Sequence, residues 1–197
     1  MTRYVLASNN PGKVREINHM LTGTGITVVP QSTFDVPAVD ETGLTFLENA
    51  LIKARHAAHH CRLPAIADDS GLEVDALNGA PGVYSARYAG QHADDQANLD
   101  KLLNDMATVP DGERRGRFHC VMVAMRHAAD PTPLVRQGTL DGVILRHAIG
   151  RHGFGYDPIF LVPSHNRSCA QLSADEKNAI SHRGQALRAL VAALTHG

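Results

Sequence analysis

The sequence predicts an α/β fold with a mixed β-sheet, formed as a single domain by residues 1–197. Short apolar runs alternate with segments of helical periodicity in the first half of the chain, and the middle is richer in strands. No linker is long enough to separate two domains. A chain of this length buries roughly 70% of the surface that its unfolded form exposes, so it needs neither disulfides nor a structural metal to fold.

The first elements alternate in type. Residues 4–7 form an apolar run before the turn residues 9–12, which predicts a strand ending in a turn. Val14, Ile17 and Leu21 then recur at the spacing of a helix. The next expected elements are a strand over 26–29, a polar and acidic loop over 30–43, and a buried strand over 64–67 that runs into Asp68 and Asp69.

The clearest helix begins near residue 46. Thr45 and Glu48 form a capping-box pattern. Asn49 and Lys53 are four positions apart, so we expect them to project together from one face. The expected apolar stripe on another face consists of Leu47, Ala50, Leu51, Ala54 and Ala58.

The second half of the chain is predicted with the same rules. A nearly continuous apolar run over 118–125 is typical of a strand in the middle of a covered sheet. Ser173 and Glu176 repeat the capping-box pattern. The other expected elements are a helix marked by Leu99, Leu102, Leu103 and Met106, two β arms over 134–137 and 142–145, a glycine-rich loop over 150–157, a last strand over 159–162, and a terminal helix marked by Leu187, Leu190, Val191 and Leu194.

Composition narrows the classes of function and location. A formal net charge of −1 excludes the basic surface that binds a nucleic-acid polymer. The three cysteines at 61, 120 and 169 match neither a disulfide framework nor a metal motif, which favours a reducing compartment. No apolar run approaches the ~20 residues needed to span a membrane, and the N-terminus turns polar too early for a signal peptide. We therefore expect a cytoplasmic protein.

The segment Ser8-Asn9-Asn10-Pro11-Gly12-Lys13 lies between an expected strand and an expected helix. Such a turn directs backbone N–H groups and the positive end of a helix to one place, which favours a phosphate. It is not a Walker A loop, because that motif needs Gly at Ala7 and Ser or Thr at Val14. The alternative is an ordinary turn that carries a surface lysine.

Acidic residues follow the expected strand over 64–67. Asp68 and Asp69 would repel one another at the end of a strand, and Mg²⁺ bound to oxygen ligands would relieve that repulsion. One carboxylate could also orient or deprotonate the attacking water. Glu41 could supply a second carboxylate, and Asn49 and Lys53 could reach a polyphosphate. The alternatives are a polar turn and a solvated helix face.

Two later segments could contact a nucleoside. Residues 153–158 contain Phe154 and Tyr156, on which a base can stack, and Asp157, which can read a base edge. Lys177 with residues 181–183 supplies cations and donors, and Arg183 could donate to a purine 6-oxo group. The alternatives are a tight turn that covers the core and the capping of helix ends.

Two other features are not interpreted as sites. His56 and His60 lack the glutamate of an H-E-x-x-H zinc site, so a surface pair is expected. Cys120 lies in an apolar strand, where a thiol is usually an inert part of the core.

Taken together, these segments resemble the inosine triphosphate pyrophosphatase family, in its bacterial branch, over nearly the whole chain. Ser8 and Asn9 stand where many relatives carry Thr and Gly, and Ser keeps the hydroxyl. The resemblance rests on the order and spacing of Ser8–Lys13, Glu41–Gly43, Glu48–Ala50, Lys53–Ala54, Ala67–Leu72, Gly79–Arg87, Gly153–Pro158, Lys177 and Ser181–Gly184.

This resemblance implies an elongated mixed sheet flanked by helices, two lobes with a nucleotide cleft between them, and a homodimer. It also implies Mg²⁺-dependent hydrolysis of ITP, dITP and XTP to the monophosphate and pyrophosphate. By this resemblance Asp69 is the catalytic proton acceptor and a metal ligand, with Glu41 as a second metal ligand. The implied substrate-binding residues are Ser8, Asn9, Asn10, Pro11, Gly12, Lys13, Lys53 and Lys177 for the triphosphate, and Ser70, Phe154, Gly155, Tyr156, Asp157, His182 and Arg183 for the nucleoside.

Two other functions stay open at the level of sequence. One is a pyrophosphatase for a modified pyrimidine or a standard dNTP, which a panel of substrates distinguishes. The other is a non-catalytic nucleotide sensor, which would bind ITP without consuming it. The acidic cluster argues against the sensor, because carboxylates beside phosphates are unfavourable without a metal.

Overall fold

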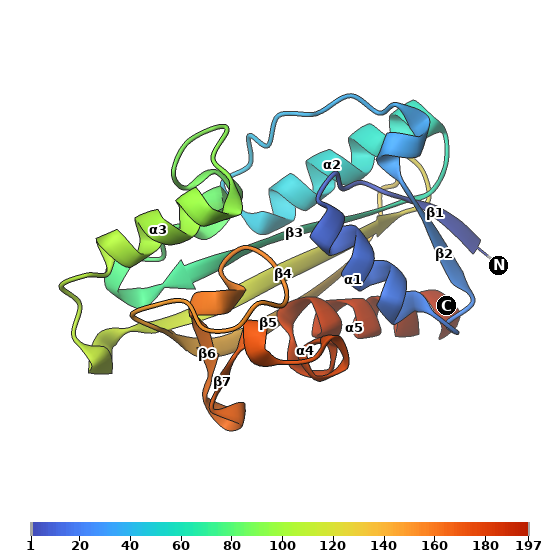
Figure 1. Cartoon of the computed structure of the whole chain (residues 1–197). Helices are drawn as coiled ribbons and strands as arrows, with labels where there is room; N and C mark the ends of the chain where they lie inside the picture. The colour runs from blue at the N-terminus through green and yellow to red at the C-terminus, as the bar shows by residue number, and fades with distance from the viewer. Residues whose placement is uncertain (1, 197) are drawn as a thin grey trace. The chain divides into compact units, whose positions relative to one another are not determined.

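The computed structural model describes residues 2–196, which form a seven-stranded mixed sheet and five α-helices in that range (Figure 1). The strand order is β2-β1-β3-β4-β5-β6-β7. The strands are β1 (Thr2–Leu6), β2 (Ile26–Pro30), β3 (Ala65–Val74), β4 (Arg115–Met125), β5 (Leu134–Ile144), β6 (Phe160–Val162) and β7 (Arg167–Ser168). The helices are α1 (Pro11–Leu21), α2 (Phe46–Cys61), α3 (Asp95–Asp105), α4 (Ala174–Ile180) and α5 (His182–His196).

Both kinds of strand pairing occur in this sheet. β1 pairs in parallel with β2 and with β3, and the register places Leu6 opposite Pro30 and Ile66. β5, β6 and β7 pair antiparallel. The predicted mixed α/β sheet flanked by helices is therefore confirmed.

The described chain divides into two compact units. The second unit comprises residues 70–119 and 139–182, and the first comprises the rest. The prediction of a single domain stays a prediction, and each unit is described by itself below.

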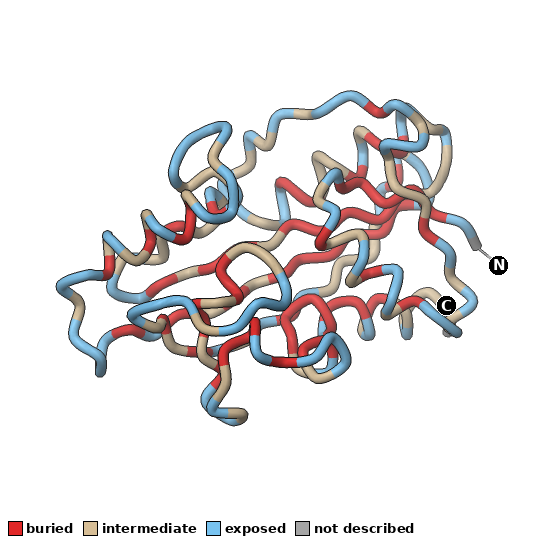
Figure 2. Tube along the Cα trace, in the orientation of Figure 1, coloured by how far each residue is buried: buried red, intermediate tan, exposed pale blue. Residues whose placement is uncertain are grey.

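In the first unit, the alternation of side chains along the strands separates two apolar clusters. Leu6 and Met122 join the cluster that α1 and α5 cover, whereas Val5 and Val123 join the cluster that α2 covers. Small alanines of α2 face the sheet, which lets the helix approach it closely. Figure 2 shows buried positions following the strands and exposed positions in the connecting loops.

In the second unit, α3 packs its predicted apolar residues into a cluster with Phe118 and Phe160. Arg114 is also buried there, with 3% of its surface exposed. Its guanidinium donates to the carbonyl oxygens of Met106, Val109, Ile144 and Leu145. A buried arginine therefore fixes the chain after α3 to the end of β5.

Local signals located the helix starts correctly. Both predicted capping boxes are present, at Thr45 with Glu48 and at Ser173 with Glu176. The α2 stripe was predicted less well, because Leu47 is 38% exposed and Asn49 is fully buried. Helical periodicity alone does not show which polar residue a neighbouring loop will cover.

Two predictions about the later strands were wrong. The two arms over 134–137 and 142–145 are one continuous strand, β5, and the strand over 159–162 is followed by β7. Gly142 lies inside β5, and a Cβ there would lie 2.4 Å from Phe160 Cε1, so this position of the strand has no room for a side chain. The loop over 30–43 contains a short 3₁₀ turn at Gln31–Phe34. Among the described residues, no helix is long and apolar enough to cross a membrane.

Candidate functional site

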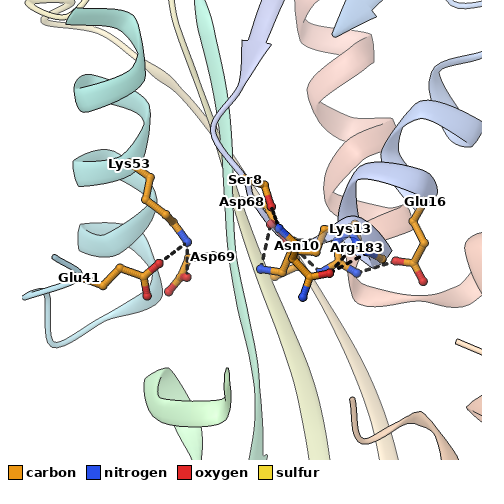
Figure 3. A network of polar contacts seen from close by, with 11 residues as sticks. Ser8, Asn10, Lys13, Glu16, Glu41, Lys53, Asp68, Asp69 and Arg183 are labelled. Carbon is orange, nitrogen blue, oxygen red and sulfur yellow. Dashed lines mark hydrogen bonds and ion pairs between the residues drawn. The ribbon is translucent and has the colours of Figure 1, made fainter. Parts of the chain in front are cut away.

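Asp68 and Asp69 lie inside β3, not in a turn at its end. β1 makes its last pair with β3 at Leu6 and Ile66, and β3 continues to Val74 beyond that point. The two carboxylates therefore follow the end of β1 within a strand that is still extended. Since neighbouring side chains of a strand point to opposite faces, Asp68 and Asp69 diverge, as Figure 3 shows.

On one face, Asp69 and Glu41 share the ammonium of Lys53. Lys53 Nζ lies 2.6 Å from Asp69 Oδ1 and 3.0 Å from Glu41 Oε1. Burial would lower the pKa of Lys53, but the surrounding carboxylates raise it above its ordinary value. Each carboxylate receives only a share of this one cation, and burial raises the pKa of Asp69. Asp69 is therefore a better proton acceptor than a solvated aspartate.

On the opposite face, Asp68 is enclosed by cations. Its Oδ1 lies 2.9 Å from Lys13 Nζ, and its Oδ2 accepts from Arg183 Nε and Nη2 at 3.1 and 3.0 Å. Arg183 also bonds to Glu16 at 2.6 Å. Burial alone would raise the pKa of Asp68, but Lys13 and Arg183 hold it well below its usual range. Asp68 therefore stays ionised as the centre of a buried network.

These contacts correct the argument that two adjacent acids need a divalent ion to relieve their repulsion. Each aspartate already has a cation on its own face. Burial still raises the pKa of Asp69 overall, and the positive charges of Lys53 and then Lys13 oppose that rise. Lys13 and Asp69 thus interact although their side chains belong to opposite faces.

The turn over residues 8–13 also differs from the expectation. Asn10 is the N-cap of α1, and its Oδ1 accepts from the N–H groups of Gly12 and Lys13 at 2.9 and 3.1 Å. Ser8 Oγ accepts from the N–H of Asn10 at 3.2 Å. The turn therefore does not present these N–H groups unpaired to a phosphate. Ser8 is buried, whereas Asn9 and Pro11 are exposed on either side of the cap.

In the second unit, Asp157 and Lys177 form a buried ion pair of 2.6 Å. Asp157 Oδ2 also accepts from the N–H of Phe154 at 2.9 Å, and Lys177 Nζ lies 5.0 Å from the Phe154 ring centroid. Tyr156 is buried and donates its hydroxyl hydrogen to Ser85 O at 2.8 Å. The N–H of Gly155 donates to Asp95 Oδ2 at 2.8 Å. The structure thus brings Phe154, Asp157 and Lys177 together and places Tyr156 in the core.

The other residues that were predicted to contact the nucleoside are Ser70, His182 and Arg183, and each has a different environment. Ser70 is half-buried in β3. His182 is 5% exposed and stacks on Phe118, with ring centroids 4.8 Å apart. Arg183, which follows it, is held in the network of Asp68. The role of Arg183 as a nucleoside contact stays a prediction.

Comparison with known proteins identifies the family. The model of the Ham1 family matches residues 4–193. The chain belongs to the Ham1 family. Ham1 relatives named dITP/XTP pyrophosphatase, from Salmonella typhi and from Escherichia coli K12, are each 58% identical over 197 residues, which is 100% of both chains compared.

Solved Ham1 structures support the same assignment. A HAM1 protein from Coxiella burnetii is 51% identical, with a TM-score of 0.91 over 100% of both chains. The Ham1 protein of Staphylococcus aureus is 44% identical, with a TM-score of 0.85 over 98% of both chains. The resemblance and the fold inferred from the sequence are thereby confirmed.

A metal site in this Ham1 chain would be an open one. The described residues contain no group of three or more His, Cys, Asp or Glu side chains arranged to hold a metal ion. Mg²⁺, however, usually binds one or two carboxylates together with substrate phosphates and water. Glu41 and Asp69, which meet at one cation, fit that mode. Asp68 does not, because two cationic side chains already hold its oxygens.

Sequence reasoning missed two residues of these networks. Glu16 lies three positions after Lys13 on α1, so helical spacing could have indicated that both project from one side of the helix toward the same network. Phe118, which stacks on His182, lies far away in the sequence, and no local signal connects the two.

Proposed function

We propose that this chain hydrolyses non-standard purine nucleoside triphosphates, namely ITP, dITP and XTP, to the monophosphate and pyrophosphate. This activity would clear such nucleotides from the pool. The full-length likeness to relatives named dITP/XTP pyrophosphatase supports the substrate class. The observation that carries the chemistry is the meeting of Asp69 and Glu41 at the ammonium of Lys53.

The reaction follows from the charges at this site. A water molecule attacks the α-phosphorus, and its proton passes to the Asp69 carboxylate as the new P–O bond forms. The bond from the α-phosphorus to the oxygen that bridges it to the β-phosphorus breaks, and pyrophosphate leaves with that electron pair. Lys53 supplies positive charge at this face, which stabilises the leaving group. Lys13, bound to Asp68 on the opposite face, adds only a longer-range charge.

The metal and the assembly belong to the same proposal. Glu41 and Asp69 would hold Mg²⁺, which when bound neutralises phosphate charge and favours attack on the α-phosphorus. We also propose a homodimer, which light scattering after size exclusion would reveal as about twice the chain mass of 21.2 kDa. The cytoplasmic location stays a prediction.

Base selection is assigned to the second unit. Phe154 offers a ring for stacking, and Asp157 offers an acceptor close to it. Lys177, which is paired with Asp157, remains the proposed contact to the triphosphate. His182 is a further proposed nucleoside contact in this unit. The nucleoside role of Arg183, which lies in the first unit, stays a prediction from the sequence. A site that donates to a 6-oxo group penalises the amino group of adenine, since an unpaired buried polar group costs about 1–3 kcal/mol.

The deciding experiment is a nucleotide panel with identification of the products. We expect ITP, dITP and XTP to yield monophosphate and pyrophosphate in the presence of Mg²⁺, with little turnover of ATP, GTP or pyrimidine triphosphates. Release of orthophosphate would contradict the reaction, and preference for a pyrimidine or a standard dNTP would favour the first alternative. Binding of ITP without turnover would favour the sensor.

Asp69→Asn tests the proposed proton acceptor. An amide cannot take the proton, so we expect kcat to fall by at least about 10²-fold while the far-UV circular dichroism stays unchanged. Asp141→Asn is a suitable control, because the Asp141 side chain is 85% exposed. Near-normal turnover of Asp69→Asn would show that another group accepts the proton.

A further inference from the structure

The segment that carries Glu41 is fixed to the first turns of α2 by hydrogen bonds. The N–H of Gly43 donates to Asn49 Oδ1 at 2.8 Å. The next two N–H groups, of Leu44 and Thr45, donate to Glu48 Oε2 at 2.8 and 2.9 Å. Three consecutive backbone N–H groups are therefore held by two neighbouring side chains of one helix.

The approach of this segment to α2 is unusually close. A Cβ at Gly43 would lie 2.5 Å from Glu48 Cβ and 2.7 Å from Asn49 Oδ1. No ordinary contact is that short, so only glycine lets the backbone reach the Asn49 amide. The bond between Gly43 and Asn49 thus depends on the residue type at both ends.

Asn49 and Lys53 hold the same segment in two ways. They lie one helical turn apart on α2. Asn49 binds the backbone of Gly43, and Lys53 binds the carboxylate of Glu41 two residues earlier. Lys53 also binds Asp69, so the chain of contacts leads from Asn49 to the proposed proton acceptor.

The Asn49 side chain is not placed to touch a nucleotide. Its residue is 0% exposed, and its Oδ1 is already used by Gly43. Its Nδ2 has no hydrogen-bond partner among the described residues. The bond to Gly43 is therefore the hydrogen bond that the Asn49 side chain makes among the described residues.

We propose that Asn49 is a positioning residue that acts through Glu41 and does not contact the triphosphate. This inference rests on the proposed function of the site and replaces the expectation that Asn49 binds substrate. By holding Gly43, Asn49 fixes the distance of the Glu41 carboxylate from Lys53 and Asp69. Loss of the bond releases Glu41 without removing any group that binds the nucleotide.

A double-mutant cycle with Asn49→Ala and Glu41→Gln tests the proposal. In the otherwise native chain, we expect Asn49→Ala to lower kcat for ITP on the order of 10- to 100-fold, because displacements of about 1 Å have effects of that size. In the Glu41→Gln background, the same change should lower kcat less than about threefold. The KM for ITP at saturating Mg²⁺ should change little in both backgrounds.

Asn98→Ala is the matched control. Asn98 is 3% exposed, and its Oδ1 accepts from the N–H of Ala89 at 2.8 Å, so it is also a buried asparagine that holds a loop. Its loss should lower the melting temperature comparably, yet its effect on kcat should be the same with and without Glu41→Gln. Gly43→Ala breaks the proposed contact from the other side and should reproduce the kinetic pattern of Asn49→Ala.

Two measurements do not depend on turnover. Hydrogen exchange at the Gly43 amide, which Asn49 holds, should accelerate in Asn49→Ala. The Kd of a non-hydrolysable α,β-methylene analogue of ITP, measured without Mg²⁺, should stay within about threefold. A Kd raised tenfold or more with kcat preserved would show that Asn49 contacts the triphosphate and would overturn the proposal. A full kcat loss in the Glu41→Gln background would overturn it as well.

Failure of the proposed function gives a different result. The native chain would then leave ITP intact, while the exchange measurement would still report whether Asn49 holds the segment. Unchanged exchange at Gly43 in Asn49→Ala would reject the positioning role whatever the substrate is.

Discussion

Two adjacent aspartates have different surroundings because a strand sends neighbouring side chains to opposite faces. Asp68 has no exposed side-chain surface and contacts two cationic side chains. Asp69 retains 7% exposure of its side chain and shares one lysine with Glu41. Asp68 therefore stabilises the fold, whereas Asp69 is available for proton transfer.

Replacing each aspartate by asparagine should therefore lower the stability of the protein by very different amounts. Asp68→Asn leaves the Arg183 guanidinium buried without its main carboxylate, so we expect the free energy of unfolding to fall by about 3–5 kcal/mol. Asp69→Asn removes a carboxylate whose burial is already unfavourable, and Lys53 keeps Glu41, so the change should stay within about 1 kcal/mol. Urea denaturation of both variants measures these values. Equal losses would contradict the division of roles.

The hydroxyl of Tyr88, in the second unit, should make the free energy of unfolding depend on pH in the alkaline range. Tyr88 donates its hydroxyl hydrogen to Asp105, and burial, with this carboxylate, raises the pKa of Tyr88 to about 12. Because the folded pKa exceeds the ordinary value of about 10, the stabilisation is complete below pH 10 and is lost as pH rises toward 12. The stability advantage of the native chain over Tyr88→Phe should therefore shrink in urea titrations above pH 10. A constant difference up to pH 11.5 would argue against the contact.

At the scale of elements, the extent of β5 was not predicted correctly, and its contacts with the neighbouring strand β6 explain why. The sequence predicted two β arms over 134–137 and 142–145, yet β5 runs unbroken from Leu134 to Ile144. Gly142 lies where Phe160 and the Leu161 carbonyl oxygen approach closely. Glycine in this strand thus makes room for β6, which pairs with β5.

Gly142→Ala should consequently destabilise the protein. Its Cβ would lie 2.4 Å from Phe160 Cε1 and 2.5 Å from Leu161 O, so β6 would have to shift. We expect the free energy of unfolding to fall by about 1–3 kcal/mol, which outweighs the gain in strand propensity. Gly112→Ala, where a Cβ meets nothing within 4 Å, should change it by less than about 0.5 kcal/mol. Thermal melts of the two variants give the comparison.

Local rules were sufficient for most helix starts. The capping boxes at Thr45 and Ser173 use contacts within three residues, so their geometry can be inferred from sequence spacing. The burial of Asn49 could not be inferred, because the loop that covers it folds back from residue 43. Polar residues on a helix are exposed or buried according to what packs on them.

At the scale of the whole molecule, family membership extends over residues 4–193, so the likeness is not confined to one motif. In the first unit the central strands separate α2 from α1 and α5, and each helix group covers its own apolar cluster. Asp68 and Asp69 each point to one of these faces (Figure 3). The sheet thus separates the buried ionic network from the proposed catalytic carboxylates.

The sequence by itself determined the fold class, the helix caps and the family, because periodicity, capping spacing and ordered motifs are properties of neighbouring residues. It also singled out Asp69, Glu41 and Lys53. Only the tertiary structure decided that Asp68 belongs to a different network, with Lys13 and Arg183. That outcome depends on which distant side chains meet at a strand face, and pairing between distant residues is set by packing of the whole chain.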